Sequence, residues 1–189
     1  RSWRNFFRLT ATFEREFRNL LNFRRLGVPT LEPIYYCQKT VDGKLRAIVV
    51  TRELEGYQPF DAQCYNPISQ IGTSRRGQVI SRVAKTLRTM HDARLQHNCL
   101  YLKHVFVKEG PDGAVDARLI DLEKAKWRPI KSIITTRDLY SLYRCAEGWS
   151  RTDRLRFFLA YRNEEHLGSE SKKLLRGIVR RLIHKNRRV

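Results

Sequence analysis

A polar loop followed by two short apolar runs constrains the fold of this chain more than any other stretch. The loop opens at His97 and enters the first apolar run, which ends at Val107. Pro111-Asp112-Gly113 is typical of a turn, and the second run, Leu119-Ile120, ends at the carboxylate of Asp121. The pattern therefore predicts a β-hairpin that holds one carboxylate at a rigid strand end.

This layout is that of the catalytic loop and metal-binding aspartate of kinase-like phosphotransferases, where the carboxylate holds the Mg²⁺ that neutralises nucleotide phosphates. The residues resemble one family in particular, the lipopolysaccharide core kinases, and within it the InaA-type branch. In that branch the loop reads roughly His-x-Cys-x-Tyr-x-x-His, as residues 97–104 do here. Its metal strand ends in Leu-Asp-Leu-Glu-Lys, which Asp121–Lys124 matches. The resemblance covers the chain from about Phe13 to Tyr161.

The composition is that of a chain with one sizeable core. Its 189 residues are 41% hydrophobic, and no apolar run approaches the ~20 residues that a membrane span needs. No secretory signal is visible. The cysteines are scattered without Cys-x-x-Cys spacing, so neither a zinc site nor a disulfide framework is predicted. They are Cys37, Cys64, Cys99 and Cys145. A reducing, cytosolic setting is expected.

The net charge of +19 predicts an electrostatic partner. Such a charge attracts polyanions of several kinds, which include nucleic acid, anionic lipid and phosphorylated glycolipid. Charge alone does not choose among them. It argues against an enzyme for a neutral substrate without an electrostatic partner.

Apolar periodicity gives the secondary structure. Five helices are predicted, at Thr12–Leu26, Ser74–Leu95, Thr136–Cys145, Thr152–Tyr161 and Ser169–His184. Two strands, Ile34–Cys37 and Ala47–Thr51, are expected to pair as a hairpin through Asp42-Gly43. The residues between Lys124 and Lys131 are expected to form an irregular basic stretch.

The resemblance implies a protein-kinase-like α+β fold with a partial N-terminal lobe and a mostly helical C-terminal lobe. Residues 1–55 would form the partial small lobe, with its regulatory helix and strand hairpin. Residues 56–189 would form the large lobe, after a hinge at Glu53–Gly56. The chain opens inside a basic aromatic segment, Arg1–Arg8, without the Gly-rich strand pair and lysine strand that come first in such folds. We therefore expect an N-terminally truncated chain.

Asp121 is the first candidate for the chemistry, as a ligand of Mg²⁺ bridging nucleotide phosphates. An aspartate that ends a strand can also cap the next turn, and this structural alternative stays open. The resemblance places His104 where related kinases have a second metal ligand, commonly Asn. An imidazole coordinates Mg²⁺ poorly, so a hydrogen bond to phosphate or an anchor for the loop are equal alternatives.

Cys99 occupies the position where active relatives carry the aspartate that accepts the proton of the acceptor hydroxyl. A thiol, with a reference pKa near ~8.5, is mostly protonated at neutral pH and is a poor base. Either the weak base suffices for a loose transition state, or the chain binds its ligands without turnover. His97 resembles the first residue of the His-Arg-Asp motif, whose usual role is to support the loop.

Further residues are implied by the resemblance as parts of the nucleotide site. Glu14-Arg15-Glu16 offers two candidates for the helix glutamate that pairs with the phosphate-binding lysine. The resemblance selects Glu16, because the family reads Glu-(aromatic)-Arg-Asn-Leu, as Glu16–Leu20 does, and a pairing with arginines one turn away is the alternative. Thr51, Glu53 and Leu54 resemble the gatekeeper and hinge that hold adenine, or else form a plain edge strand. Asp138 resembles the large-lobe aspartate that bonds the backbone of the catalytic loop.

The last helix is basic and amphipathic. Its apolar stripe is Leu174, Leu175, Ile178, Val179, Leu182 and Ile183. Such a helix can lie on an anionic membrane or pack its apolar stripe on the large lobe. Packing is favoured for the apolar stripe, and the basic residues can still bind an anionic membrane electrostatically.

By resemblance the function is ATP-dependent, Mg²⁺-dependent phosphorylation of a heptose or Kdo sugar in the lipopolysaccharide inner core. The expected place is the cytoplasmic face of the inner membrane, with phosphorylated glycolipid and the anionic membrane surface as partners. One alternative is a catalytically silent kinase-like protein that binds nucleotide or glycolipid. Another is a basic nucleic-acid-binding protein, although nucleic acid is not expected because no aromatic stacking motif is found.

Overall fold

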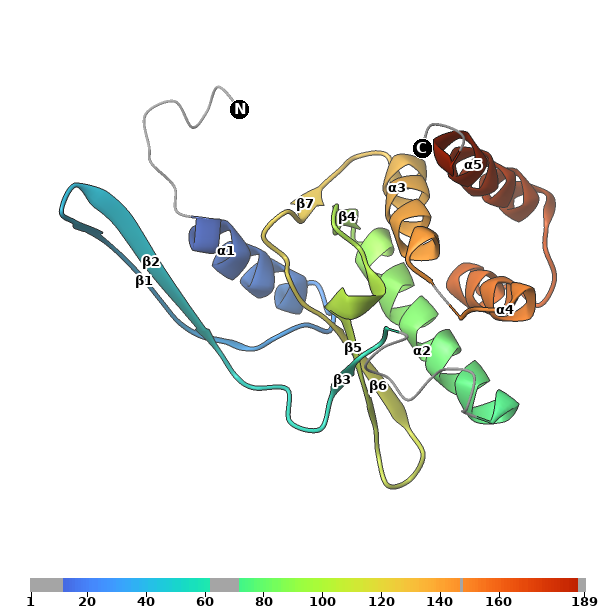
Figure 1. Ribbon diagram of the computed structural model, residues 1–189, viewed down its shortest axis with the longest axis horizontal. Helices are drawn as coiled ribbons and strands as arrows, with labels where there is room; N and C mark the ends of the chain where they lie inside the picture. The colour runs from blue at the N-terminus through green and yellow to red at the C-terminus, as the bar shows by residue number, and fades with distance from the viewer. Residues whose placement is uncertain (1–11, 62–71, 147, 187–189) are drawn as a thin grey trace.

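The computed structural model describes residues 12–61, 72–146 and 148–186, with the side chains given as far as residue 183 (Figure 1). The basic aromatic segment Arg1–Arg8, Cys64 and the last two arginines lie outside the described residues. The fold is a mixture of helices and small antiparallel sheets, as predicted for an α+β chain.

The N-terminal part consists of one helix and one long hairpin. Helix α1 spans Thr12–Arg25, and strands β1 (Pro33–Val41) and β2 (Lys44–Thr51) pair antiparallel. Asp42 and Gly43 both have positive φ, at 50° and 69°, as a tight two-residue hairpin turn requires. The predicted helix and hairpin are confirmed, and both strands are longer than predicted.

The hairpin predicted around Asp112-Gly113 supplies two strands of a three-stranded sheet. Its strands are β3 (Gln58–Pro59), β5 (Val105–Glu109) and β6 (Val115–Leu119), in the order β3-β5-β6. Alternate residues of β5 and β6 are buried and face α2 (Thr73–Asp92), the long helix that crosses the middle of the molecule (Figure 1). This packing fixes the strand end that carries Asp121.

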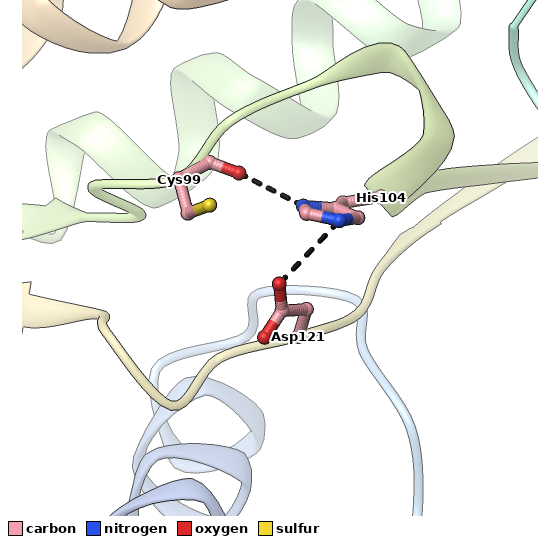
Figure 2. A group of neighbouring side chains, drawn as sticks. All are labelled: Cys99, His104 and Asp121. Carbon is pink, nitrogen blue, oxygen red and sulfur yellow. Dashed lines mark hydrogen bonds and ion pairs between the residues drawn. The ribbon is translucent and has the colours of Figure 1, made fainter.

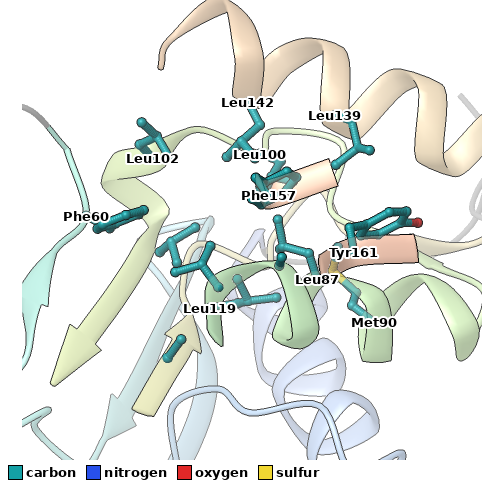
Figure 3. Close-up of a cluster of buried hydrophobic side chains, with 14 of the residues drawn as sticks. Phe60, Leu87, Met90, Leu100, Leu102, Leu119, Leu139, Leu142, Phe157 and Tyr161 are labelled. Atoms are coloured by element: carbon teal, nitrogen blue, oxygen red, sulfur yellow. The ribbon is translucent and has the colours of Figure 1, made fainter. Parts of the chain in front are cut away.

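The remaining helices form one side of the molecule. They are α3 (Lys131–Arg144), α4 (Arg151–Arg162) and α5 (Ser169–Asn186). Two further strands of two residues each, β4 (Leu95–Gln96) and β7 (Lys126–Trp127), pair antiparallel beside the start of α3. The core between α2, α3, α4 and the sheet includes Leu87, Leu119, Leu142 and Phe157, all fully buried (Figure 3).

Two details differ from the sequence prediction. Helix α3 begins at Lys131, five residues before the predicted start at Thr136, because burial of Ile134 and Thr135 draws this segment into the helix. The stretch expected to be irregular contains β7, whose partner β4 lies about thirty residues earlier in the chain. The division of the chain at residues 55 and 56 stays a prediction.

Helix α5 packs on the large helical part with most of its apolar stripe. Ile178 is fully buried, and Leu174, Leu175 and Leu182 pack against the core. The prediction that this stripe packs on the protein is therefore confirmed for four of its six residues. Val179 and Ile183 are instead exposed.

Candidate functional site

Backbone pairing brings the loop and the strand end together. A turn of 3₁₀ helix at Leu102–His104 leads directly into β5, where Val105 pairs with Leu119 of β6. The pairing extends one residue further, since the Ile120 N–H donates to the His104 carbonyl at 3.0 Å. His104 is thereby held opposite Asp121.

The side chains of Cys99, His104 and Asp121 converge at this point (Figure 2). The Cys99 sulfur, a His104 ring nitrogen and an Asp121 carboxylate oxygen all lie within 4.8 Å of one another. His104 donates its Nδ1–H to the Cys99 carbonyl at 2.8 Å, because a carbonyl oxygen can only accept. The other nitrogen, Nε2, faces Asp121 Oδ2 at 3.4 Å. A proton or a metal ion between these two atoms would stabilise the arrangement.

This donor set suits Mg²⁺ only in part. Asp121 offers carboxylate oxygens, which Mg²⁺ combines with phosphate oxygens and water in nucleotide sites. Its side chain is 42% exposed, so a ligand can approach it. The imidazole nitrogen of His104 and the sulfur of Cys99 are donors that Mg²⁺ does not favour. Asp121 is therefore the residue with the chemistry to hold Mg²⁺, and a magnesium role for His104 stays a prediction.

The backbone of Asp121 is in the left-handed region, with φ at 57°. A non-glycine residue there costs of order 1–3 kcal/mol and persists where its surroundings hold it. Asn19 of α1 helps to hold the residues that follow Asp121. Its side-chain amide donates to the carbonyls of Leu122 at 2.6 Å and Ala125 at 2.9 Å. Sequence reasoning assigned no role to Asn19, although it lies in the Glu16–Leu20 match.

His97, which opens the loop, is fully buried. Its ring stacks on that of His104, with centroids 5.9 Å apart, and its Nε2–H donates to the Ile120 carbonyl at 3.0 Å. Burial is the largest influence on its pKa, which it lowers, so the ring is held neutral. These contacts are those of a support for the loop, and a catalytic role for His97 stays a prediction.

Asp138 of α3 holds the start of the loop at His97 and Asn98. Its carboxylate accepts the backbone N–H groups of His97 at 2.8 Å and Asn98 at 3.0 Å. It also accepts from His91 Nε2 at 3.2 Å, and His91 Nδ1 is bonded to the Tyr161 hydroxyl at 2.8 Å. The predicted contact of Asp138 with the loop backbone is confirmed.

Glu16 of α1 lies close to the carboxylates of Asp121 and Glu123. Burial raises its pKa most, and the negative charges of Asp121 and Glu123 raise it further. Among the residues that the structure describes, no cation pairs with Glu16. Glu14, the other glutamate considered, is buried and pairs with Arg18. The structure thus brings Glu16, and not Glu14, toward Asp121.

The predicted adenine-binding residues form no hydrogen bond with this group in the described part of the chain. Thr51 ends β2, Glu53 is exposed and Leu54 is half-buried. The Leu54 carbonyl accepts the N–H of Tyr57 at 3.2 Å, which closes a turn before β3. No hydrogen bond or ion pair within the described ranges joins this segment to Cys99, His104 or Asp121.

Comparison with known proteins places the chain in a family. Residues 2–161 match the model of the lipopolysaccharide kinase (Kdo/WaaP) family. The chain belongs to this family. It is 26% identical over 143 residues to Protein InaA of Escherichia coli strain K12, a match that spans 75% of this chain and 65% of the relative. The chain thus covers somewhat less than two thirds of that relative's length.

A solved structure shows the same fold. The structure titled "WaaP in complex with acyl carrier protein" superimposes with a TM-score of 0.70 and 21% identity, over 92% of this chain and 75% of the other. The predicted kinase-like α+β fold is therefore confirmed. In this member of the Kdo/WaaP family, Cys99 lies in the loop that begins at His97, and Asp121 follows the end of β6.

Proposed function

We propose that this protein is an ATP-dependent kinase that phosphorylates a sugar, heptose or Kdo, of the lipopolysaccharide inner core. One observation carries the proposal: the catalytic-loop residue Cys99 and the strand-end carboxylate Asp121 converge in a chain of the lipopolysaccharide kinase family. The nucleotide would lie between the N-terminal part with α1 and the helical part, with adenine at Glu53 and Leu54.

Each side chain has a separate task in this proposal. Asp121 holds Mg²⁺ at the nucleotide phosphates, and the ion supplies charge neutralisation there. His97 and Asp138 fix the loop, so that Cys99 faces the acceptor hydroxyl. Burial raises the pKa of Glu16 most and the charge of Asp121 raises it further, so a cationic group beside both carboxylates would offset the repulsion between them.

The first test concerns Asp121. We expect Asp121→Asn to abolish the dependence of ATP affinity on Mg²⁺, because an amide lacks the charge that holds the ion. Asn tolerates the left-handed backbone at this position, so the fold should be kept. ATP affinity is measured by calorimetry with and without Mg²⁺.

Glu123→Gln is the matched control, since it removes a neighbouring carboxylate that pairs with Arg15 at the surface. It should leave the Mg²⁺ dependence intact. If Asp121→Asn retains the full effect of Mg²⁺, the assignment of Asp121 is wrong.

A catalytically silent kinase-like protein that binds nucleotide or glycolipid is the second candidate. The observation in its favour is Cys99, which places a thiol where a carboxylate base is expected. ATP binding without any transfer to core glycolipid would favour this candidate.

We also propose that the protein acts at the cytoplasmic face of the inner membrane, where its positive charge meets anionic lipid and phosphorylated glycolipid. Helix α5 supports this: along the part of it whose side chains are described, the exposed basic residues are Lys172, Lys173, Arg176, Arg180 and Arg181. Val179 and Ile183 are exposed among them. Within the described part of the chain, no helix has the length and apolar character to cross a bilayer.

Binding to anionic vesicles is expected to weaken as salt rises, because exposed charges are screened over ~10 Å at 0.1 M salt. Replacing Lys172, Lys173 and Arg176 by Gln should weaken it clearly. The matched control loses three exposed charges from the hairpin instead, at Lys39, Lys44 and Arg46. Co-sedimentation across a salt series measures both. Equal binding to neutral vesicles, or a preference for nucleic acid, would contradict the membrane proposal.

A further inference from the structure

We propose that Cys99, His104 and Asp121 form a binding site for a transition-metal ion such as Zn²⁺. Sulfur, imidazole nitrogen and carboxylate oxygen are the three donors that proteins use for Zn²⁺. The same set is a poor cage for Mg²⁺, which prefers oxygen alone. Cys99 thus acquires a role as a metal ligand, in addition to its place opposite the acceptor.

The spacing of the donor atoms fits such an ion after a small adjustment. Zn–S and Zn–N bonds of ~2.3 and ~2.0 Å put tetrahedral ligand atoms roughly 3.3–3.8 Å apart. His104 Nε2 and Asp121 Oδ2 are already 3.4 Å apart. All three donor atoms lie within 4.8 Å of one another, so a shift of about 1 Å at the Cys99 side chain would complete the set.

The surroundings of His104 provide an independent observation. A metal-binding histidine almost always donates its other ring N–H to a carbonyl or carboxylate, which fixes the tautomer and aims the free nitrogen. His104 does so through the Cys99 carbonyl, at 2.8 Å. Its ring is also held between those of His97, stacked at 5.9 Å, and Tyr101, at 5.5 Å. The nitrogen is therefore aimed at Asp121 before any ion arrives (Figure 2).

The site is open to solvent on one side, because Asp121 is 42% exposed and Cys99 is half-buried. Three protein ligands leave a fourth position for water, as in catalytic zinc sites and not in closed structural ones. If the proposed function holds, Zn²⁺ and the magnesium–nucleotide complex would compete for Asp121. The metal site itself does not depend on turnover.

The test is a titration of the whole protein with Zn²⁺ and with Co²⁺, without nucleotide or sugar. We expect one tight ion per chain by calorimetry, unaffected by excess Mg²⁺, and a near-ultraviolet sulfur-to-cobalt absorption band. Cys99→Ser should remove the band and weaken Zn²⁺ by more than the 10–100-fold that the loss of a second-shell partner costs. His104→Gln should weaken Zn²⁺ as well, and circular dichroism checks that both variants fold.

Cys145→Ser and Cys37→Ser are matched controls, because Cys145 is half-buried and Cys37 exposed, and both are free thiols elsewhere in the fold. Each should keep the band and the affinity. The proposal is overturned if Cys99→Ser binds both ions as the natural chain does, or if either control loses the band. It is also overturned if Zn²⁺ binds no more tightly than Mg²⁺. Because the titration measures no turnover, its result tests the metal site even if the kinase proposal fails.

Discussion

Replacement of Cys99 by aspartate is expected to raise the rate of phosphoryl transfer by about 10²–10⁴-fold, the usual worth of a positioned general base. The position belongs to a loop that is already held in place through the backbone N–H groups of His97 and Asn98. A carboxylate there would accept the proton of the acceptor hydroxyl, which a neutral thiol does poorly. The measurement is single-turnover transfer from ATP to core glycolipid, with trace metals removed beforehand.

Cys99→Ala is the informative partner of this variant, since it removes the thiol without supplying a base. Little change with alanine and a gain with aspartate would support a slow enzyme. Loss of activity with alanine would show that the thiol itself is required, which contradicts the weak-base interpretation. The absence of transfer from every variant, with ATP binding intact, would favour the silent kinase-like protein.

Loss of Asp138 is expected to lower the free energy of unfolding by about 3–5 kcal/mol, because each donor that loses its acceptor in a buried site costs about 1–3 kcal/mol. Asp138→Ala leaves the buried N–H of His97, the part-buried N–H of Asn98 and the buried ring of His91 without their acceptor. Urea denaturation measures the change. Because the loop loses its anchor, nucleotide and metal binding at Asp121 should weaken together.

Asp92→Ala is the comparison for Asp138→Ala. Asp92 also pairs with basic side chains, Lys131 and Arg88, but at the surface. Exposed pairs contribute about 0–1 kcal/mol, so this variant should be close to the natural chain in stability. If the two variants lose similar amounts, the buried network around Asp138 does not have the role described here.

Local patterns predicted much of the fold because their causes are local. The apolar steps of α1 and α2 and the Asp42-Gly43 turn each depend on neighbours within a few residues. The start of α3 and the strands β4 and β7 were missed for the opposite reason. Two-residue strands exist only through a distant partner, and Ile134 becomes helical because the core buries it.

The choice between Glu14 and Glu16 shows the same limit. Both lie in the first turns of α1, and propensity does not distinguish them. A family resemblance selected Glu16, and the packing of α1 turns it toward Asp121 while Glu14 is buried beside Arg18. The assignment of Glu16 to a nucleotide site remains a prediction.

The sequence by itself determined the helices except the start of α3, the two hairpins, the family, and the residues at the loop and the strand end. Only the tertiary structure decided that Cys99, His104 and Asp121 form one group of donors. No Cys-x-x-Cys spacing in the sequence indicates this group. Its three residues come together through the pairing of β5 with β6 and through a hydrogen bond from the His104 ring to a backbone carbonyl. Side chains can bind one metal ion when their donor atoms have suitable distances and directions in space. The spacing of residues along the chain indicates this geometry only when the ligands lie on one local element.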